Sequence, residues 1–131
     1  MNFLTPNDVI TLHEVMINRF GGSLGIRDEN GLDATLNRPK NIFAYEADSY
    51  PAQVVLTKMA AAILSGLIES HPFIDGNKRV AFTSCIAFLR SNGVYFHPSE
   101  DEFYDITVGL ATRRTTEDEA IIWISKNMSV H

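Results

Sequence analysis

The sequence has a single cysteine and fewer basic than acidic residues. Cys85 has no second cysteine to pair with, which excludes an internal disulfide, and its apolar neighbours favour buried packing over a reactive thiol. Lys and Arg number 11 against 16 Asp and Glu, giving a net charge of −5. That balance argues against broad, charge-driven binding of nucleic acid or anionic membranes, so we expect no DNA binding by this chain alone and no membrane contact.

Other features are also missing. We find no charged-then-apolar leader and no uninterrupted apolar run of about 18 residues, which predicts a cytoplasmic protein. There is no repeat, low-complexity tract or linker. A chain of 131 residues, 45% of them apolar, can fill one sizeable core, so we expect a single domain over residues 1–131.

Helical patterns account for most of the chain. Two segments, 51–69 and 78–90, are apolar on nearly every side of a helix, as is typical of buried helices. Another helix starts at Thr5-Pro6, and capping-box patterns at Ser99–Glu102 and Thr116–Glu119 start two more. The sequence predicts an all-α fold, a compact bundle of about six helices around a buried central pair.

The region before the first buried helix is predicted to be less regular. A short helical turn carries Leu32 and Leu36 and ends at Pro39, because proline interrupts a helix. From Lys40 to Tyr50, aromatic and polar residues alternate loosely, which favours an exposed hairpin or flap; the alternative is an ordinary surface loop. His13 lies on the apolar face of the first helix, where a core histidine is more common than a ligand.

Chemically active residues gather between the two buried helices. His71, Asp75, Asn77, Lys78 and Arg79 fall within nine residues. We expect them at the deepest crossing of the core, where a merely structural connector would not collect charges because burying unpaired charge is costly. The same connection is therefore the predicted functional site.

Each of these residue types suits phosphate chemistry. Gly76 lets the backbone pass close to a ligand, and the N–H groups that open the next helix form an anion site. Arg79 can grip phosphate oxygens by two bonds, and Lys78 adds a compact positive charge. Asp75 suits a partly hydrated Mg²⁺ that bridges phosphates. His71 can accept a proton near neutral pH.

Other interpretations of single residues remain open. Asp75 could cap the following helix, and a lone histidine or arginine is more often structural than catalytic. One His and one Asp, with no second His or Cys nearby, are too few for structural zinc. Phe73 is apolar within a polar loop and is expected to anchor it in the core.

The segment His71-Pro-Phe-Ile-Asp-Gly-Asn-Lys-Arg79 resembles the Fic family signature H-P-F-x-[D/E]-G-N-G-R, and departs from it at Lys78 alone. Further stretches are similar to the death-on-curing branch, the short toxins of bacterial toxin–antitoxin pairs: Gly25–Asp28, Ala44–Glu46, Phe88–Gly93 and Asp105–Gly109. The resemblance implies a Fic/Doc-like helical fold with the motif between two central helices.

The resemblance also implies roles, with ATP and Mg²⁺ as cofactors. His71 would be the general base on a target hydroxyl, and Asp75 the Mg²⁺ ligand. Nucleotide phosphates would be bound by Gly76, Asn77, Lys78 and Arg79. A flap that holds the target segment as an extended strand would comprise Phe43, Ala44, Tyr45 and Glu46.

Two departures from the Fic pattern bear on the reaction. Typical members transfer AMP and carry Gly and a second Arg where this chain has Lys78 and Phe82. Both changes match the death-on-curing branch, whose best-known chemistry is phosphorylation of elongation factor Tu, although Gly76 keeps the usual Fic residue. We therefore expect phosphoryl transfer from ATP to a protein hydroxyl. The alternatives are AMP transfer and a catalytically inactive, antitoxin-binding scaffold; a helical DNA-binding module would need a basic helix that the chain lacks.

Many Fic proteins restrain themselves with a helix of pattern [S/T]-x-x-x-E-[G/N]. Thr115 and Glu119 have the right spacing, but Ala120 follows where Gly or Asn is required. Ser65 and Glu69 fail in the same way. The missing inhibitory motif predicts a separate antitoxin as partner.

Overall fold

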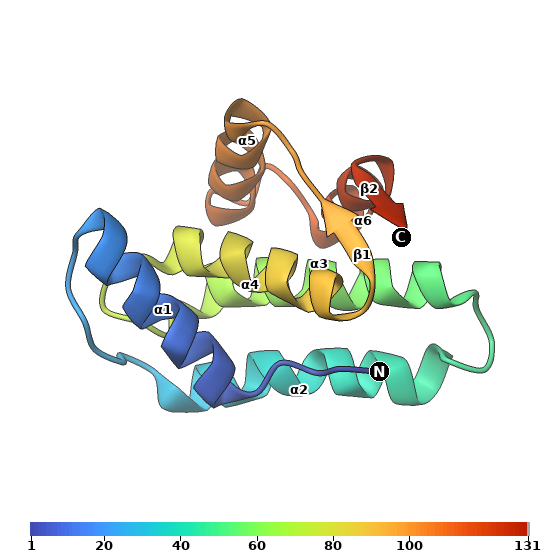
Figure 1. The fold of residues 1–131 in the computed structure, drawn as a ribbon, viewed down its shortest axis with the longest axis horizontal. Helices are drawn as coiled ribbons and strands as arrows, with labels where there is room; N and C mark the ends of the chain where they lie inside the picture. The colour runs from blue at the N-terminus through green and yellow to red at the C-terminus, as the bar shows by residue number, and fades with distance from the viewer. Residues whose placement is uncertain (131) are drawn as a thin grey trace.

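The computed structural model describes residues 1–130, so His131, the last residue of the predicted domain, lies outside it. This part of the chain forms six α-helices and a small antiparallel sheet (Figure 1). The helices are α1 (Pro6–Phe20), α2 (Glu29–Glu46), α3 (Ala52–Ser70), α4 (Asn77–Ser91), α5 (Glu100–Ala111) and α6 (Glu117–Lys126). The strands are β1 (Val94–Phe96) and β2 (Met128–Val130). The predicted all-α fold of about six helices is confirmed.

Helix α3 forms the centre of the bundle. It packs against α2, α4, α5 and α6, and buries side chains around its whole circumference, as its sequence predicts. Among residues 1–130 it is the one helix that is long and apolar enough to cross a membrane. The sequence search for an uninterrupted apolar run did not detect it, because polar residues interrupt the helix. Because 72% of that stretch is buried inside the molecule, its apolar surface is used in the core.

Helix starts and core positions largely follow the sequence. Capping boxes form at Thr5, Ser99 and Thr116, and each satisfies N–H groups that a helix N-terminus leaves free. His13 is buried, as predicted for a core histidine. Cys85 is fully buried in α4, and burial raises the pKa of its thiol to about 12, which agrees with a packing role.

Helix α2 departs from the prediction. It does not end at Pro39 but continues through it to Glu46, so residues 40–46 are helical and the exposed hairpin predicted for 40–50 is wrong. Leu32, Leu36 and Pro39 lie on one buried face, and α2 packs along α3. Burial of this face offsets the one helical hydrogen bond that proline removes, so tertiary packing overrides the local signal.

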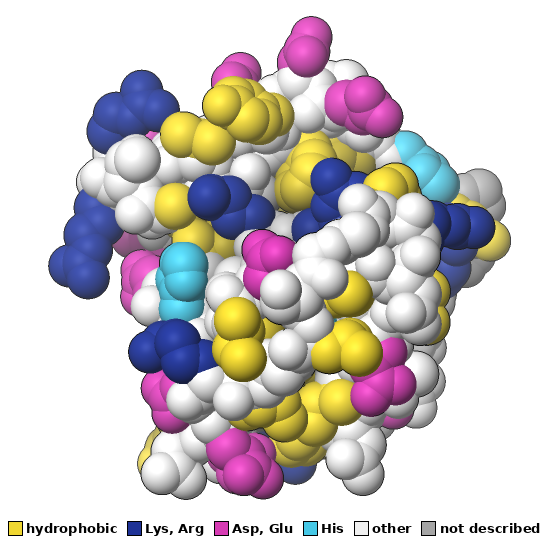
Figure 2. Space-filling model, turned by 90° about the vertical axis from the view of Figure 1, so that its left-hand side faces the viewer, with side chains coloured by type: hydrophobic (Ala, Val, Ile, Leu, Met, Phe, Trp, Pro, Cys, Tyr) yellow, Lys and Arg dark blue, Asp and Glu magenta, His cyan; other side chains and the backbone are white. Residues whose placement is uncertain are grey.

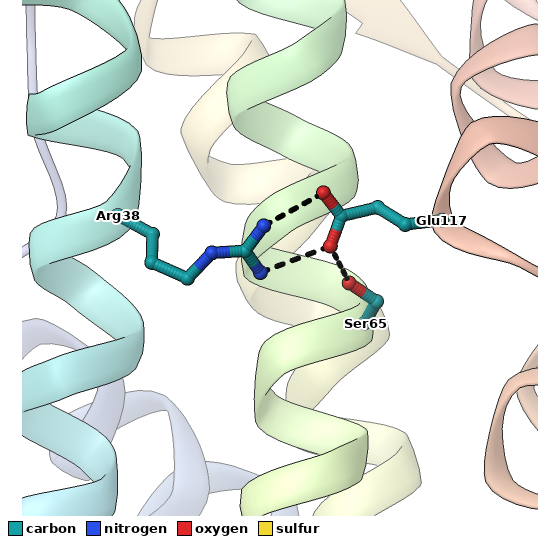
Figure 3. Close-up of polar contacts among 3 residues, drawn as sticks. All are labelled: Arg38, Ser65 and Glu117. Atoms are coloured by element: carbon teal, nitrogen blue, oxygen red, sulfur yellow. Dashed lines mark hydrogen bonds and ion pairs between the residues drawn. The ribbon is translucent and has the colours of Figure 1, made fainter.

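A charged network ties three helices together (Figure 3). Arg38 of α2 donates two hydrogen bonds, of 2.9 and 2.8 Å, to the carboxylate of Glu117 at the start of α6. The hydroxyl of Ser65 in α3 donates to the same carboxylate. Burial raises the pKa of Glu117, but the hydrogen bonds from Arg38 and Ser65 outweigh it and hold the pKa below its ordinary value.

We expect Glu117→Gln to lower the free energy of unfolding at pH 7 by on the order of 1 kcal/mol, since this partly exposed pair is screened by solvent. A carboxylate with a lowered folded-state pKa stabilises the fold fully above its ordinary pKa of 4.5, and loses that effect as pH falls through the lowered value. Urea unfolding at several pH values should show the wild-type advantage shrinking in acid. Glu14→Gln, at an exposed position of α1, is the control, and a pH-independent difference would contradict the assignment.

Candidate active site

The motif loop, residues 71–76, joins α3 to the antiparallel α4 at one end of the molecule (left in Figure 1). His71 and Asp75 in this loop are exposed, as are Lys78 and Arg79 at the start of α4. The expectation that these residues lie at the deepest crossing of the core is therefore wrong: a short connection between antiparallel helices lies where they end. Phe73 is 1% exposed and does anchor the loop, with its ring stacked on His13 at 3.9 Å.

Two residues with positive φ shape the loop. His71 ends α3 in the left-handed conformation (φ 46°, ψ 58°), and Gly76 precedes α4 at φ 75°. Asn77 is buried, and its side chain accepts from the Phe73 N–H at 3.0 Å and donates to the Phe73 carbonyl at 2.9 Å. Its amide nitrogen also lies 3.4 Å from Nδ1 of His71. The Asn77 side chain thus holds the loop together. The group that Asn77 offers to a ligand is its backbone N–H.

The N-terminus of α4 is open. The N–H groups of its first turn, from Asn77 to Arg79, have no helical carbonyl to bond. No side chain caps them. These N–H groups and the positive end of the helix dipole attract anions. Lys78 and Arg79 add two positive side chains, and the Arg79 guanidinium lies 4.1 Å from the centre of the Phe20 ring. This end of α4 is suited to phosphate.

A cavity of about 400 Å³ opens between the motif loop and α5. It is lined by His71, Ile74, Asp75, Gly76, Asn77, Lys78, Arg79, Phe103, Tyr104 and Thr107. In Figure 2, which faces this end of the molecule, Lys and Arg side chains stand on both sides of a hollow, with a histidine and an acidic side chain nearby. The structure thus brings the predicted base, metal ligand and phosphate-binding residues around one space.

Asp75 is held in position by backbone groups. Its Oδ1 accepts from the Gly76 N–H at 2.9 Å and its Oδ2 from the Ser23 N–H at 3.1 Å, so it does not cap the free N–H groups of α4. Two hydrogen bonds leave further lone pairs on an exposed carboxylate. No group of three or more His, Cys, Asp or Glu residues that could hold a metal exists within residues 1–130. One carboxylate fits a Mg²⁺ that is also held by phosphates and water.

A family model described as Fic/DOC family matches residues 3–89, which include the whole motif and more than half of the chain. The chain belongs to the Fic/DOC family. It is 37% identical over 112 residues to Protein kinase doc of Escherichia phage P1, covering 86% of this chain and 84% of that protein. It is 40% identical over 92 residues to Toxin Doc of Mycolicibacterium smegmatis, covering 70% of this chain and 65% of that protein.

The segment beside the Fic/DOC motif comprises residues 22–28, which the sequence had not assigned to the site. Ile26 forms an isolated antiparallel bridge with Phe73, and the Ile74 N–H donates to the Gly25 carbonyl at 3.1 Å. A Cβ on Gly22 would lie 2.6 Å from Oδ2 of Asp75. The available signals were the glycines at positions 22 and 25 and the likeness of Gly25–Asp28 to the death-on-curing branch.

The predicted flap, Phe43 to Glu46, lies elsewhere. These residues form the last turn of α2, whereas the start of that helix adjoins the motif loop, with the Asp28 N–H donating to the Pro72 carbonyl. At 1.5 Å per residue, the last turn is about 20 Å further along the helix axis. Glu46 pairs with Lys58 of α3 at 2.8 Å instead. The assignment of these four residues to an extended flap beside the motif is wrong.

The α5 wall of the cavity was also missed. Phe103, Tyr104 and Thr107 face the motif from a helix that the sequence predicted, but without any role in the site. The Thr107 hydroxyl donates to carbonyls within its own helix, and Tyr104 is 66% exposed. Helical periodicity alone could not indicate that this face of α5 would meet the motif.

Proposed function

We propose that this Fic/DOC protein is a Mg²⁺-dependent protein kinase and the toxin of a bacterial toxin–antitoxin pair. It transfers the γ-phosphoryl group of ATP to a hydroxyl of a target protein in the cytoplasm, a translation factor such as elongation factor Tu. The observation that carries the proposal is an exposed His71 in the same cavity as the uncapped start of α4. The names of the two relatives, a protein kinase and a toxin, support it.

Each residue of the cavity has a defined task in this reaction. His71 takes the proton of the target hydroxyl as the hydroxyl oxygen bonds to the γ-phosphorus. The bond between that phosphorus and the bridging oxygen breaks, and ADP leaves. The first N–H groups of α4, with Lys78 and Arg79, hold the phosphates and stabilise the charge that develops on them. Asp75 would hold Mg²⁺, which neutralises phosphate charge when bound.

The side chain at position 82 favours phosphoryl over AMP transfer. Phe82 stands where a typical AMP-transferring Fic enzyme has a second arginine, and its ring packs edge-on against Phe103 at 3.8 Å. It lines an adjoining cavity of about 680 Å³ together with Phe20 and Phe103. With phenylalanine at position 82, the positive side chains of α4 that line the motif cavity are Lys78 and Arg79. Both lie in the first turn of α4, and His71 lines the same cavity. This arrangement suits a reacting phosphate at the start of α4.

The lining of the motif cavity supports control by a separate antitoxin. Within residues 1–130, no glutamate lines it. Glu119, from the incomplete inhibitory pattern, accepts from the Thr116 N–H at 3.0 Å in a capping box. An antitoxin partner that supplies the missing inhibitory group is therefore part of the proposal.

The reaction is tested by incubating the protein with Mg²⁺, cell lysate and ATP labelled on either the α- or the γ-phosphate. We expect label to reach protein from the γ-phosphate alone, because that phosphoryl group is transferred. The matched control is His71→Ala, which lacks the proposed base.

Two other results would each overturn the proposal. Transfer of the α-label alone would identify AMP transfer. Absence of any transfer, together with no ATP-induced rise in the thermal unfolding temperature in Mg²⁺, would identify an inactive scaffold.

A further inference from the structure

Arg27 contacts the start of the motif loop without lining the motif cavity. Its side chain is directed at main-chain carbonyls: Nε donates to the His71 carbonyl and Nη2 to the Ser70 carbonyl, both at 2.7 Å. Arg27 is not among the residues that line the motif cavity. Its charge is therefore used to hold the protein backbone at His71.

These two carbonyls need a partner. They lie at the C-terminal end of α3, where carbonyls lack helical N–H donors and the helix dipole is negative. A guanidinium offers several N–H donors in one plane and can satisfy two adjacent acceptors at once. The 2.7 Å distances are those of strong, charge-assisted hydrogen bonds.

The residue held in this way is the proposed base. His71 has φ 46° and ψ 58°, a left-handed conformation that is unfavourable for a residue with a Cβ and persists only when its surroundings enforce it. Relaxation towards a right-handed or extended conformation would turn the Cα–Cβ bond of His71. The imidazole would then leave its present position on the wall of the motif cavity.

The neighbours of Arg27 hold the following residues of the loop. The N–H groups of Arg27 and Asp28 both donate to the Pro72 carbonyl, at 2.7 and 3.0 Å, and the Gly25 carbonyl accepts from Ile74. Segment 25–28 is therefore a template for the backbone from Ser70 to Ile74. The phosphate-binding end of α4 is outside these contacts.

We propose that Arg27 is a positioning residue that fixes the left-handed conformation of His71, and so places the imidazole for proton transfer. The proposal rests on the phosphoryl transfer proposed above. Because Arg27 touches the base and not the phosphate-binding groups, its loss should lower kcat and leave the KM for ATP unchanged. A residue needed only for folding would not separate these two constants.

The test compares Arg27→Gln and Arg27→Lys with Arg38→Gln. Arg38 is an apt control because it also makes two charged hydrogen bonds, but to Glu117 and away from the motif loop. We expect kcat of Arg27→Gln to fall roughly 100-fold, as for a displaced catalytic group, at constant KM for ATP. Arg27→Lys keeps the charge and should recover part of the loss. Arg38→Gln should unfold at a lower temperature but keep its kcat.

A second readout does not depend on activity. The NMR resonances of the His71 imidazole, assigned by comparison with His71→Gln, should shift in nucleotide-free Arg27→Gln and stay in place in Arg38→Gln. If the His71 resonances shift in Arg27→Gln but the wild type transfers no phosphoryl group, the positioning role stands and the proposed reaction is refuted. An active wild type, with kcat and His71 resonances unchanged in Arg27→Gln, would overturn the positioning role. If Arg27→Gln does not fold, the same two measurements on Arg27→Lys decide.

Discussion

Replacing His71 with alanine should lower the rate of transfer by roughly 10²–10⁴-fold, the contribution typical of a positioned general base. The fold should remain, because the His71 side chain is exposed. The hydrogen bond from Arg27 is accepted by the main-chain carbonyl of residue 71, which the variant retains. The measurements are the initial rate of label transfer from γ-labelled ATP and the thermal unfolding temperature.

His97→Ala is the matched control for this prediction. His97 is also exposed, and its ring stacks on Tyr95 away from the motif loop. Its removal should leave the transfer rate at the wild-type value. A wild-type rate in His71→Ala would remove His71 from the mechanism, whatever nucleotide the protein binds.

Asp75→Asn should raise the Mg²⁺ concentration needed for half-maximal transfer by more than about tenfold, because even a residue that only supports a metal ligand typically contributes 10–100-fold to metal affinity. Asparagine keeps the size of the side chain and an oxygen that can accept from Ser23, but it lacks the negative charge that a hard cation prefers. The measurement is a Mg²⁺ titration of the transfer rate at fixed ATP.

The control for the metal prediction is Asp48→Asn, an exposed carboxylate in the turn after α2, at the other end of that helix from the motif. It should leave the titration unchanged. If Asp75→Asn has the Mg²⁺ dependence of the wild type, Asp75 is not the metal ligand.

The sequence predicted elements whose signals are local. The all-round apolar pattern of 51–69 predicted the buried helix α3, and capping boxes at Ser99 and Thr116 marked the starts of α5 and α6. Motif composition likewise predicted which residues the structure gathers around one cavity. Such features depend on neighbours within a few positions, so they can be read without knowledge of the tertiary fold.

Features that depend on distant contacts were missed. Pro39 is a local stop signal, but the packing of α2 on α3 carries the helix through it to Glu46. The exposure of His71 follows from the loop lying at the end of two antiparallel helices, and the wall formed by Tyr104 depends on where α5 docks. The contact of Arg27 with His71 spans 44 positions, so no local pattern could indicate it.

The proposed reaction requires ATP and its metal to bind in the cavity between the motif loop and α5. The most direct test of this binding is NMR of the protein with ATP and Mn²⁺, which replaces Mg²⁺ and broadens the amide resonances of nearby residues. We expect broadening to be strongest from Asp75 to Arg79, to extend to Tyr104 and Thr107, and to spare Phe43 to Glu46. Broadening centred elsewhere, or unchanged by Asp75→Asn, would contradict this prediction.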